Sequence, residues 1–267
     1  MLRSPLRPFL TVAFVCVIAA GCSGAGPGGA EEDGCETVTV LAASSFAPAL
    51  RDPVVNPCAG KWNVSSGSST ALAAQVREGA PADVFVSAGR KAVDSLIADR
   101  LTVGEPVALG SVRMALVTGT GAGPESLEEL PGFVQDGGTV GLCVASAPCG
   151  AAADAVLANA AAVWGGEFGR SSIAVTEAAS AEDLVNKVVT GEVDAVLVYE
   201  YVCVARPNEE LAVRCVDIPD EVNGTPLNVR TPYLAVRLRE SAASDSFMTF
   251  VSSAAFRTYL AANLRIS

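Results

Sequence analysis

Hydroxyl side chains gather at residues 65–70, where five of the six residues are Ser or Thr and the sixth is Gly67. The apolar run Trp62 to Val64 precedes this cluster and predicts the end of a strand, and Leu72 and Val76 follow it four residues apart, as on one face of a helix. The cluster therefore lies at a strand-to-helix turn. The first backbone N–H groups of a helix have no intrahelical partner, and the helix dipole is positive there. Hydroxyls beside such N–H groups can bind an anion.

The same residues also fit a simpler role, in which Ser68 or Ser69 only caps the helix. A second turn of this kind follows the strand predicted at residues 37–41, where Ser44 and Ser45 precede a short helical pattern. If the two strands are parallel neighbours, Ser45 and Ser69 meet at the carboxyl edge of the sheet, where open α/β sheets bind ligands. This coincidence favours an anion site over capping alone.

The composition excludes several classes of function. The chain has 267 residues, half of them apolar, which is enough for one large domain or two smaller ones. It contains no histidine, the commonest general base and zinc ligand, and its net charge of −11 comes without the basic stripe of a nucleic-acid-binding protein. The enzymatic alternative is a serine hydrolase with a nucleophile at residues 65–69 and Lys61 or Lys91 as base, but both G-x-S-x-G and S-x-x-K are absent.

The N-terminal residues predict export. Two arginines precede an apolar stretch, Phe9 to Ala20, that is too short to span a bilayer comfortably. The residues Ala-Ala-Gly-Cys that end it resemble a bacterial lipobox, in which a signal peptidase cuts before the cysteine and the cysteine carries lipid. We expect a signal peptide at residues 1–21, a lipid anchor on Cys22 at the outer face of the cell membrane, and a flexible tether at residues 22–35. The alternative is an ordinary signal peptide with a cysteine nearby by chance.

Six cysteines follow Cys22. An even number of cysteines in an exported protein indicates disulfides, here three, although fifteen pairings are possible from sequence alone. Spacing favours pairs of neighbouring cysteines, and Cys35 and Cys58 each precede a predicted strand, so parallel pairing of those strands would bring them together. A metal site is disfavoured because no C-x-x-C and no histidine is present. The predicted pairs are Cys35–Cys58, Cys143–Cys149 and Cys203–Cys215.

Strand and helix patterns alternate from residue 37 to the C-terminus. β-Branched and apolar runs predict strands, and segments with apolar residues three or four apart predict helices. The alternation predicts an α/β fold with mostly parallel sheets. Beyond the two strands above, the predicted strands cover residues 84–86, 112–117, 140–144, 173–175, 194–199 and 229–238, and the predicted helices include residues 46–50, 90–99, 151–164, 180–190 and 245–264.

Five short motifs are spread along the chain: A-A-S-S-F at residues 42–46, the Ser cluster with E-G-A-P-A-D-V-F-V-S at 65–87, A-P-C-G at 147–150, A-E-D-L-V at 181–185 and V-L-V-Y at 196–199. Together they resemble the periplasmic molybdate-binding proteins of ABC transporters, from about Thr37 to the C-terminus. The second motif is the most specific. In that family, two α/β lobes joined by a hinge with two chain crossings close over a tetrahedral oxyanion.

The resemblance also implies how the lobes divide and which residues bind the ligand. Lobe 1 would combine residues 36–112 and 228–267, and lobe 2 would be residues 113–227. Hydroxyl and backbone N–H donors would hold the oxyanion, with no cofactor and no metal beyond the molybdate itself. Cys149 stands where the family often has a small residue, so its side chain must be accommodated. By position, the donors are Ser45 and Ser69 through hydroxyl and amide, Cys149 and Leu184 through the backbone N–H, and Tyr199 through its phenol.

A fully ionised dianion has only hydrogen-bond acceptors, so a site made only of donors suits it. A site without a nearby carboxylate also disfavours ligands that carry a proton. The resemblance implies that a monomer binds molybdate or tungstate and delivers it to a membrane permease. The alternative ligands are a sulfate-like oxyanion and a ferric ion, the latter because Tyr199 and Tyr201 are similar to the paired tyrosines of ferric-binding proteins. Tyr199 also fits a core position with its hydroxyl at the surface.

Overall fold

The computed structural model describes residues 35–56, 58–121, 123–205 and 213–267 of the chain. The predicted signal peptide, the lipidation site at Cys22 and the tether up to Gly34 lie outside the described residues. Among the helices that the structure does describe, none is both long and apolar enough to cross a membrane.

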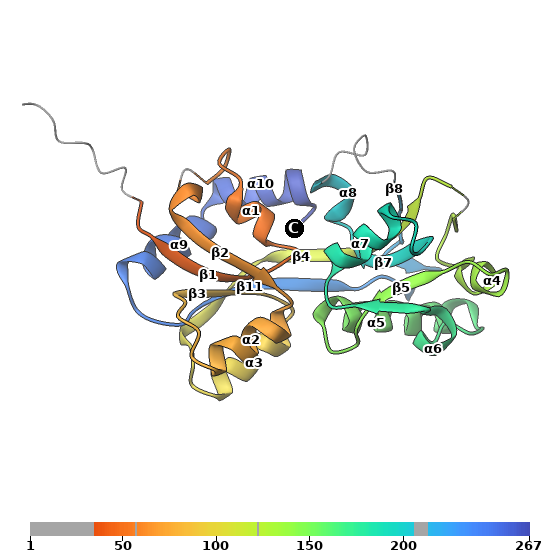
Figure 1. The fold of residues 1–267 in the computed structure, drawn as a ribbon, viewed down its shortest axis with the longest axis horizontal. Coiled ribbons are helices and arrows are strands. Elements are labelled where there is room, and N and C mark those ends of the chain that lie inside the picture. Colours follow the sequence, from red (N-terminus) through yellow and green to blue (C-terminus); the bar gives the residue numbers. More distant parts are fainter. Residues whose placement is uncertain (1–34, 57, 122, 206–212) are drawn as a thin grey trace, which may run out of the picture. The chain divides into compact units, whose positions relative to one another are not determined.

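A sheet of nine strands organises the described residues, in the spatial order β2-β1-β3-β11-β4-β7-β5-β6, with β8 also paired to β4 (Figure 1). The pairs β2–β1, β1–β3, β7–β5 and β5–β6 are parallel, and every antiparallel pair of this sheet involves β4 or β11. The two short strands β9 (Glu221–Val222) and β10 (Thr225–Pro226) form a separate ribbon. The strands of the sheet are β1 (Val38–Ala43), β2 (Trp62–Gly67), β3 (Val84–Ala88), β4 (Val103–Gly119), β5 (Val140–Cys143), β6 (Thr176–Ala178), β7 (Ala195–Tyr199), β8 (Val213–Val216) and β11 (Arg230–Arg237).

The long strands β4 and β11 join the two ends of this sheet (Figure 1). β4 pairs with β11 as far as Arg113 and with β7 from Met114 onward, so one strand belongs to both ends. We call the part built on β1, β2 and β3 lobe 1 and the part built on β5, β6 and β7 lobe 2. The α/β architecture with two lobes is the one that the sequence predicts. The residue boundaries of the lobes, at 112/113 and 227/228, stay predictions.

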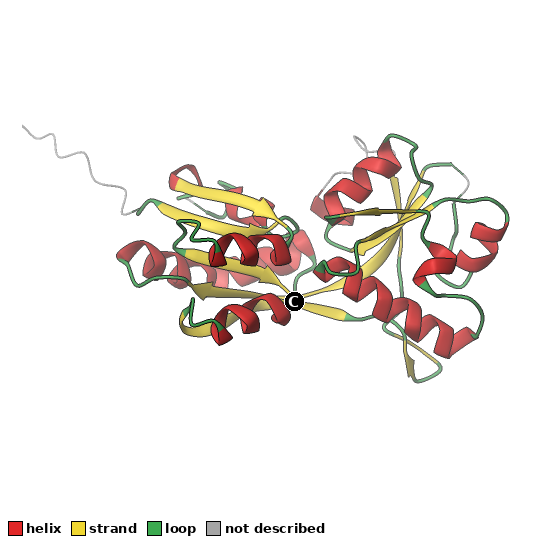
Figure 2. Cartoon of the chain, turned by 60° about the horizontal axis from the view of Figure 1, so that its bottom comes forward, coloured by secondary structure: helices red, strands yellow, loops and turns green. Residues whose placement is uncertain are grey.

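Helices flank the sheet in both lobes (Figure 2). The alternation of side chains along a strand explains how β1 contributes to two cores. Val40 packs in one cluster with Phe256 of α10, whereas Leu41 packs in another cluster with Leu72 of α2. The helices are α1 (Ala47–Arg51), α2 (Ser69–Arg77), α3 (Arg90–Ala98), α4 (Leu130–Gln135), α5 (Pro148–Trp164), α6 (Arg170–Ile173), α7 (Ala181–Val189), α8 (Val202–Ala205), α9 (Ala242–Val251) and α10 (Ala254–Leu264), with a short 3-10 helix at Ala59–Lys61.

Two predicted elements differ from the structure. The strand predicted at residues 173–175 is not formed, because α6 ends there and β6 begins only at Thr176. An apolar run of three residues is too short for its pattern to distinguish a strand from a short helix. The single helix predicted at residues 245–264 is instead the pair α9 and α10. Ser253 starts the second helix by accepting a hydrogen bond from the Phe256 N–H at 3.2 Å, and such a cap ends one helix and begins another.

The structure contains the three disulfides that the sequence predicts. The first joins two residues that precede β1 and β2, and these strands are parallel with Val38 opposite Trp62, so their starts lie at the same edge of the sheet. The second joins the end of β5 to the first turn of α5, and the third joins α8 to β8. The pairs are Cys35–Cys58, Cys143–Cys149 and Cys203–Cys215.

Candidate anion-binding site

A small cavity lies between the lobes, at the carboxyl ends of β1, β2, β3, β6 and β7 and at the start of α5. The space open to the centre of a water-sized sphere is only about 20 Å³, whereas pockets for drug-sized organic ligands measure roughly 300–1,000 Å³. Ligands of open α/β sheets bind at this edge. The residues that line the cavity are Ala43, Ser44, Ser45, Gly67, Ser68, Ser69, Ala88, Pro148, Cys149, Ala179, Ser180, Ala181 and Tyr199.

Ser45 lies in the turn between β1 and α1. The neighbouring amides are engaged: the Ser44 N–H donates to the Gly67 carbonyl at 3.0 Å and the Phe46 N–H donates to the Ala43 carbonyl at 2.8 Å. The N–H of Ser45 makes no hydrogen bond to another described residue. Ser45 therefore offers both an amide and a hydroxyl to the cavity.

The sequence left open whether the serines at this turn cap the helix or bind an anion, and Ser68 and Ser69 differ in this respect. Ser68 is the N-cap of α2, and its side chain accepts a hydrogen bond from the Ala71 N–H at 3.3 Å. Ser69, which is 1% exposed, instead accepts a hydrogen bond on its Oγ from the Ala88 N–H at 2.9 Å. A serine whose oxygen already accepts a bond keeps its O–H for donation. Capping by Ser68 thus leaves the Ser69 hydroxyl, at the first turn of α2, as a donor toward the cavity.

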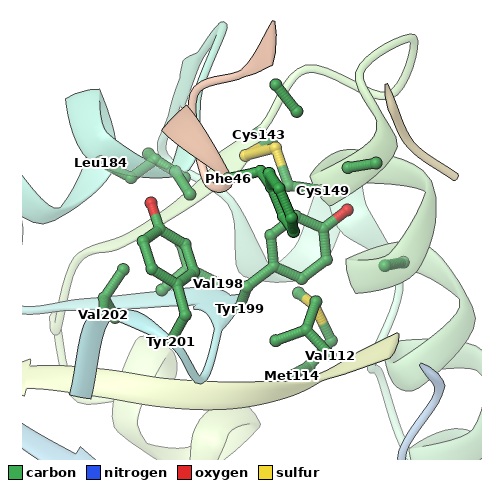
Figure 3. Packing of buried hydrophobic residues seen from close by; sticks show 14 of the residues in the cluster. Phe46, Val112, Met114, Cys143, Cys149, Leu184, Val198, Tyr199, Tyr201 and Val202 are labelled. Carbon is green, nitrogen blue, oxygen red and sulfur yellow. A yellow bond between two sulfur atoms is a disulfide. The ribbon is translucent and has the colours of Figure 1, made fainter. Parts of the chain in front are cut away.

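The start of α5 offers backbone donors. Ala147 is the N-cap, Pro148 has no N–H, and the first helical bond runs from the Ala151 N–H to the Ala147 carbonyl at 3.0 Å. The amide of Cys149 therefore has no partner within the helix. The side chain of Cys149 is buried and forms the disulfide with Cys143 (Figure 3). The disulfide therefore accommodates a side chain larger than the small residue that the family often has at this position.

Leu184, the amide donor that the resemblance implies on α7, lies behind the lining of the cavity. Its N–H donates to the Ser180 carbonyl at 3.3 Å, its side chain is completely buried in the core, and it does not line the cavity. Ser180 is the N-cap of α7 and accepts a hydrogen bond from the Asp183 N–H at 3.1 Å. The first helical residue is therefore Ala181, which lines the cavity. The assignment of an amide donor to Leu184 stays a prediction, and Ala181 is a second candidate at the start of the same helix.

Tyr199 ends β7 and reaches the cavity from lobe 2, on the side where Cys149 lies (Figure 3). It is 2% exposed, and its phenol oxygen has no hydrogen bond to another described residue. Burial raises the pKa of Tyr199 above its ordinary value, and the nearby hydroxyl of Thr231 lowers it only in part. The phenol therefore stays protonated at neutral pH, so it is a hydrogen-bond donor without a negative charge.

The cavity joins neutral donors from both lobes. No charged side chain occurs among the residues that line it. The helices α2, α5 and α7 all begin at this cavity, and each brings the positive end of its dipole and unpaired N–H groups. Of the predicted site residues, Ser45, Ser69, Cys149 and Tyr199 meet here and Leu184 does not. Such a lining suits a small anion that carries only acceptors.

Two α/β lobes connected by two strands, with a small cavity between them, are the architecture of periplasmic binding proteins, which close on their ligands by hinge motions. The chain belongs to the bacterial extracellular solute-binding protein family, whose sequence profile matches residues 38–263. Binding proteins of this family are not enzymes, and none of the described residues lining the cavity is a lysine that could serve a serine nucleophile as base.

One relative, the molybdate-binding protein ModA of Mycobacterium tuberculosis (strain CDC 1551 / Oshkosh), is 30% identical over 236 residues, which cover 85% of this chain and 83% of the relative. Among solved structures, the periplasmic molybdate-binding protein of Azotobacter vinelandii has a TM-score of 0.62 at 20% identity and covers 80% of this chain and 91% of its own. The sulfate-binding protein SubI of Mycobacterium tuberculosis H37Rv has a TM-score of 0.66 at 17% identity, with 86% of both chains covered. At these identities the two structures show the fold alone.

Proposed function

We propose that this protein captures molybdate, and also tungstate, between its lobes and delivers the anion to the membrane permease of an ABC transporter. The observation that carries the proposal is the lining of the cavity, where hydroxyls and helix N-termini converge without any charged side chain. The choice of anion is supported by the relative that is 30% identical and is named a molybdate-binding protein.

Five residues supply the donors in this proposal. From lobe 1, Ser45 and Ser69 donate through their hydroxyls and amides. From lobe 2, Cys149 and Ala181 donate through their backbone N–H groups, and Tyr199 donates through its phenol. Molybdate is a dianion at neutral pH, so all four of its oxygens accept. Neutral dipoles in a site closed to water hold such a charge without a buried salt bridge.

A ferric ion suits this lining poorly. A buried cation needs anionic partners, and the lining contains no carboxylate. Tyr199 is also the one tyrosine among the residues that line the cavity, so the lining does not contain a pair of phenols. Sulfate has the charge and shape of molybdate but is smaller, so the fit of the ion to the cavity decides between them. Sulfate is therefore the decisive competitor in a binding experiment.

We also propose that the protein is exported as a monomer and held at the outer face of the cell membrane by lipid on Cys22. The three disulfides support export, because such bonds persist in oxidising compartments. Fractionation of cells expressing the chain tests the anchor. The unchanged protein should be found with membranes, and a Cys22→Ser variant should be found in the soluble fraction. Equal membrane association of both forms would contradict the anchor.

Isothermal titration calorimetry tests the choice of ligand. The chain from residue 23 onward would be titrated with molybdate, tungstate, sulfate, phosphate and ferric ion at neutral pH. We expect saturable binding at one site per chain for molybdate and tungstate, with sulfate and phosphate at least an order of magnitude weaker. Tighter binding of ferric ion, or no binding of molybdate, would contradict the proposal.

A further inference from the structure

The first turn of α5 is joined to the sheet of lobe 2 by a disulfide beside the cavity. Cys143, the last residue of β5, is bonded to Cys149, the second residue of α5 (Figure 3). Both cysteines are buried, and Cys149 lines the cavity. β5 runs parallel to β7, and β7 ends at Tyr199. The disulfide therefore ties the start of α5 to the same sheet that brings Tyr199 to the cavity.

The side chain of Arg170 joins the same two segments a second time. Its guanidinium donates to the Cys143 carbonyl at 2.8 Å and to the Gly150 carbonyl at 3.2 Å. The carboxylates of Asp154 and Glu177 pair with this guanidinium at 2.8 and 2.6 Å and hold it in place. A planar guanidinium has five N–H donors in a fixed geometry, so it can bridge several acceptors at once. Arg170 thus connects the end of β5 with the first turn of α5.

The backbone also packs closely at this point. Gly150 is the third residue of α5, and a Cβ added to it would overlap the carbonyl oxygens of Cys143 and Val144. The first turn of α5 is therefore in direct contact with the backbone at the end of β5. A displacement of this turn would move the N–H of Cys149, which has no partner within the helix.

The disulfide between Cys143 and Cys149 is poorly suited to stabilising the fold as a whole. In the chain-entropy account, a disulfide stabilises a protein more when it closes a longer loop. Cys143 and Cys149 are 6 positions apart, whereas the separation is 12 for Cys203–Cys215 and 23 for Cys35–Cys58. The disulfide with the shortest loop is the one at the cavity, which indicates a local role rather than a global one.

Building on the proposed oxyanion site, we propose that Cys143, Cys149 and Arg170 are positioning residues for the backbone donor at the start of α5. The disulfide and the guanidinium hold this turn in the geometry that binds the anion before the anion arrives. The N–H of Cys149 then needs no ordering when the anion binds, so less binding free energy is lost in fixing it. Arg170 does not line the cavity and acts only through the two carbonyls that it bridges.

Replacement of both cysteines by alanine, Cys143→Ala with Cys149→Ala, tests this role because it keeps every backbone N–H group. Molybdate affinity would be measured by titration calorimetry well below the melting temperature, which would be measured separately. We expect the affinity to fall about threefold to tenfold, less than the loss of a whole hydrogen bond to a charged ligand would cause. An unchanged affinity would overturn the proposal.

The disulfide Cys35–Cys58 is the matched control. It precedes β1 and β2 and so lies at the opposite edge of the sheet from the cavity, which neither cysteine lines. Its replacement by two alanines should lower the melting temperature more than the first pair does, because its loop is longer, and should leave the affinity unchanged. A merely structural role would make the losses of affinity follow the losses of stability. That order, or equal losses of affinity in both variants, would overturn the proposal.

Arg170→Lys keeps the proposal testable if the first alanine pair does not fold. It keeps the positive charge beside the two carboxylates, but its amine does not reproduce the bridge between the carbonyls of Cys143 and Gly150. Molybdate affinity should fall about twofold or more, since one contact that fixes the turn is weakened. Hydrogen exchange at the Ala151 amide, which donates to Ala147, should be faster in the ligand-free variant. An affinity equal to that of the unmodified protein would overturn the proposal.

These outcomes are separate from those that test the proposed function. If the unmodified protein failed to bind molybdate, the proposed function would fail. If it binds molybdate and the variants of Cys143, Cys149 and Arg170 bind equally well, only the positioning role fails.

Discussion

Lobe 1 and lobe 2 offer the cavity different kinds of donor. Lobe 1 contributes serine hydroxyls on two strand-to-helix turns, at Ser45 and Ser69. Lobe 2 contributes the phenol of Tyr199 and the backbone N–H groups of Cys149 and Ala181, at the starts of two helices. A hydroxyl donor can be recognised from the residue type. A backbone N–H is present in every residue except proline, and it is free to bind a ligand only where its position in a helix leaves it without an intrahelical partner. The contribution of lobe 2 therefore depends on where helices begin rather than on residue type.

The largest effects are expected in lobe 1, from Ser45→Ala and Ser69→Ala. Each change removes a hydrogen bond to a charged ligand, worth about 1.5–3 kcal/mol, so molybdate affinity should fall about tenfold to a hundredfold in calorimetry. Ser69→Ala should also lower the melting temperature, because the buried Ala88 N–H loses its acceptor. Binding like that of the unmodified protein in both variants would mean that the anion is not held by these turns.

Ala181→Pro is the equivalent test in lobe 2. Proline is tolerated at the first position of a helix, so this change deletes the N–H and keeps α7. We expect affinity to fall about tenfold, with an unchanged circular dichroism spectrum. Leu184→Met is the matched control, because it nearly conserves the volume of a core residue whose amide is already bonded within α7. Affinity in Ala181→Pro equal to that of the unmodified protein would contradict the assignment of the amide donor to Ala181.

Tyr199→Phe should reduce the affinity by about tenfold while the fold is kept, because one donor to the anion is lost. The pKa of Tyr199 is raised by burial above its ordinary value of 10.0, so binding to the unmodified protein should not depend on this group between about pH 6 and 9. Because the pKa is higher in the folded than in the unfolded chain, the stability linked to this group is present below pH 10 and is lost as the pH rises further. A fall in affinity between pH 6 and 9 that disappears in Tyr199→Phe would show an ionised phenol instead.

Thr70→Ala should have the smallest effect on binding. The Thr70 hydroxyl donates to the Ser146 carbonyl at 2.9 Å and so connects α2 of lobe 1 with the turn before α5 of lobe 2. An exposed neutral hydrogen bond contributes about 0.5–1.5 kcal/mol, so the affinity should fall about twofold to tenfold, through faster dissociation of the anion. Stopped-flow measurement of the dissociation rate checks this. A loss as large as that of Ser69→Ala would make Thr70 a ligand contact rather than a contact between lobes.

The fold could be predicted where residue patterns are long and unambiguous. The alternation of strands and helices followed from apolar runs. The parallel pairing of β1 with β2 was only a supposition from the sequence, and the structure contains it. Short segments were less informative, because the run at residues 173–175 belongs partly to α6. The break between α9 and α10 was also missed, since the apolar spacing at residues 245–264 continues across Ser253 and only the cap separates the two helices.

The sequence predicted the side-chain donors of the site better than its backbone donors. The sequence placed Ser45, Ser69 and Tyr199 correctly at the edge of the sheet that lines the cavity, while their contact with a ligand stays a prediction. The resemblance assigned an amide of α7 to Leu184, and this stays a prediction; in the structure the residue of α7 that lines the cavity is Ala181. The hydrogen bond from the Ala88 N–H to Ser69 joins β3 to α2. Because the two residues are far apart in the sequence, no local sequence pattern predicts this contact.

The most direct test of the donor-lined site is a crystal structure of the protein with molybdate, in which the anomalous scattering of molybdenum locates the ion without ambiguity. We predict a single molybdenum peak in the cavity, with its oxygens at about 2.7–3.2 Å from the hydroxyls of Ser45, Ser69 and Tyr199 and from the backbone nitrogens of Cys149 and Ala181. A peak elsewhere, or an ion in the cavity whose oxygens contact charged side chains instead of these donors, would contradict the account.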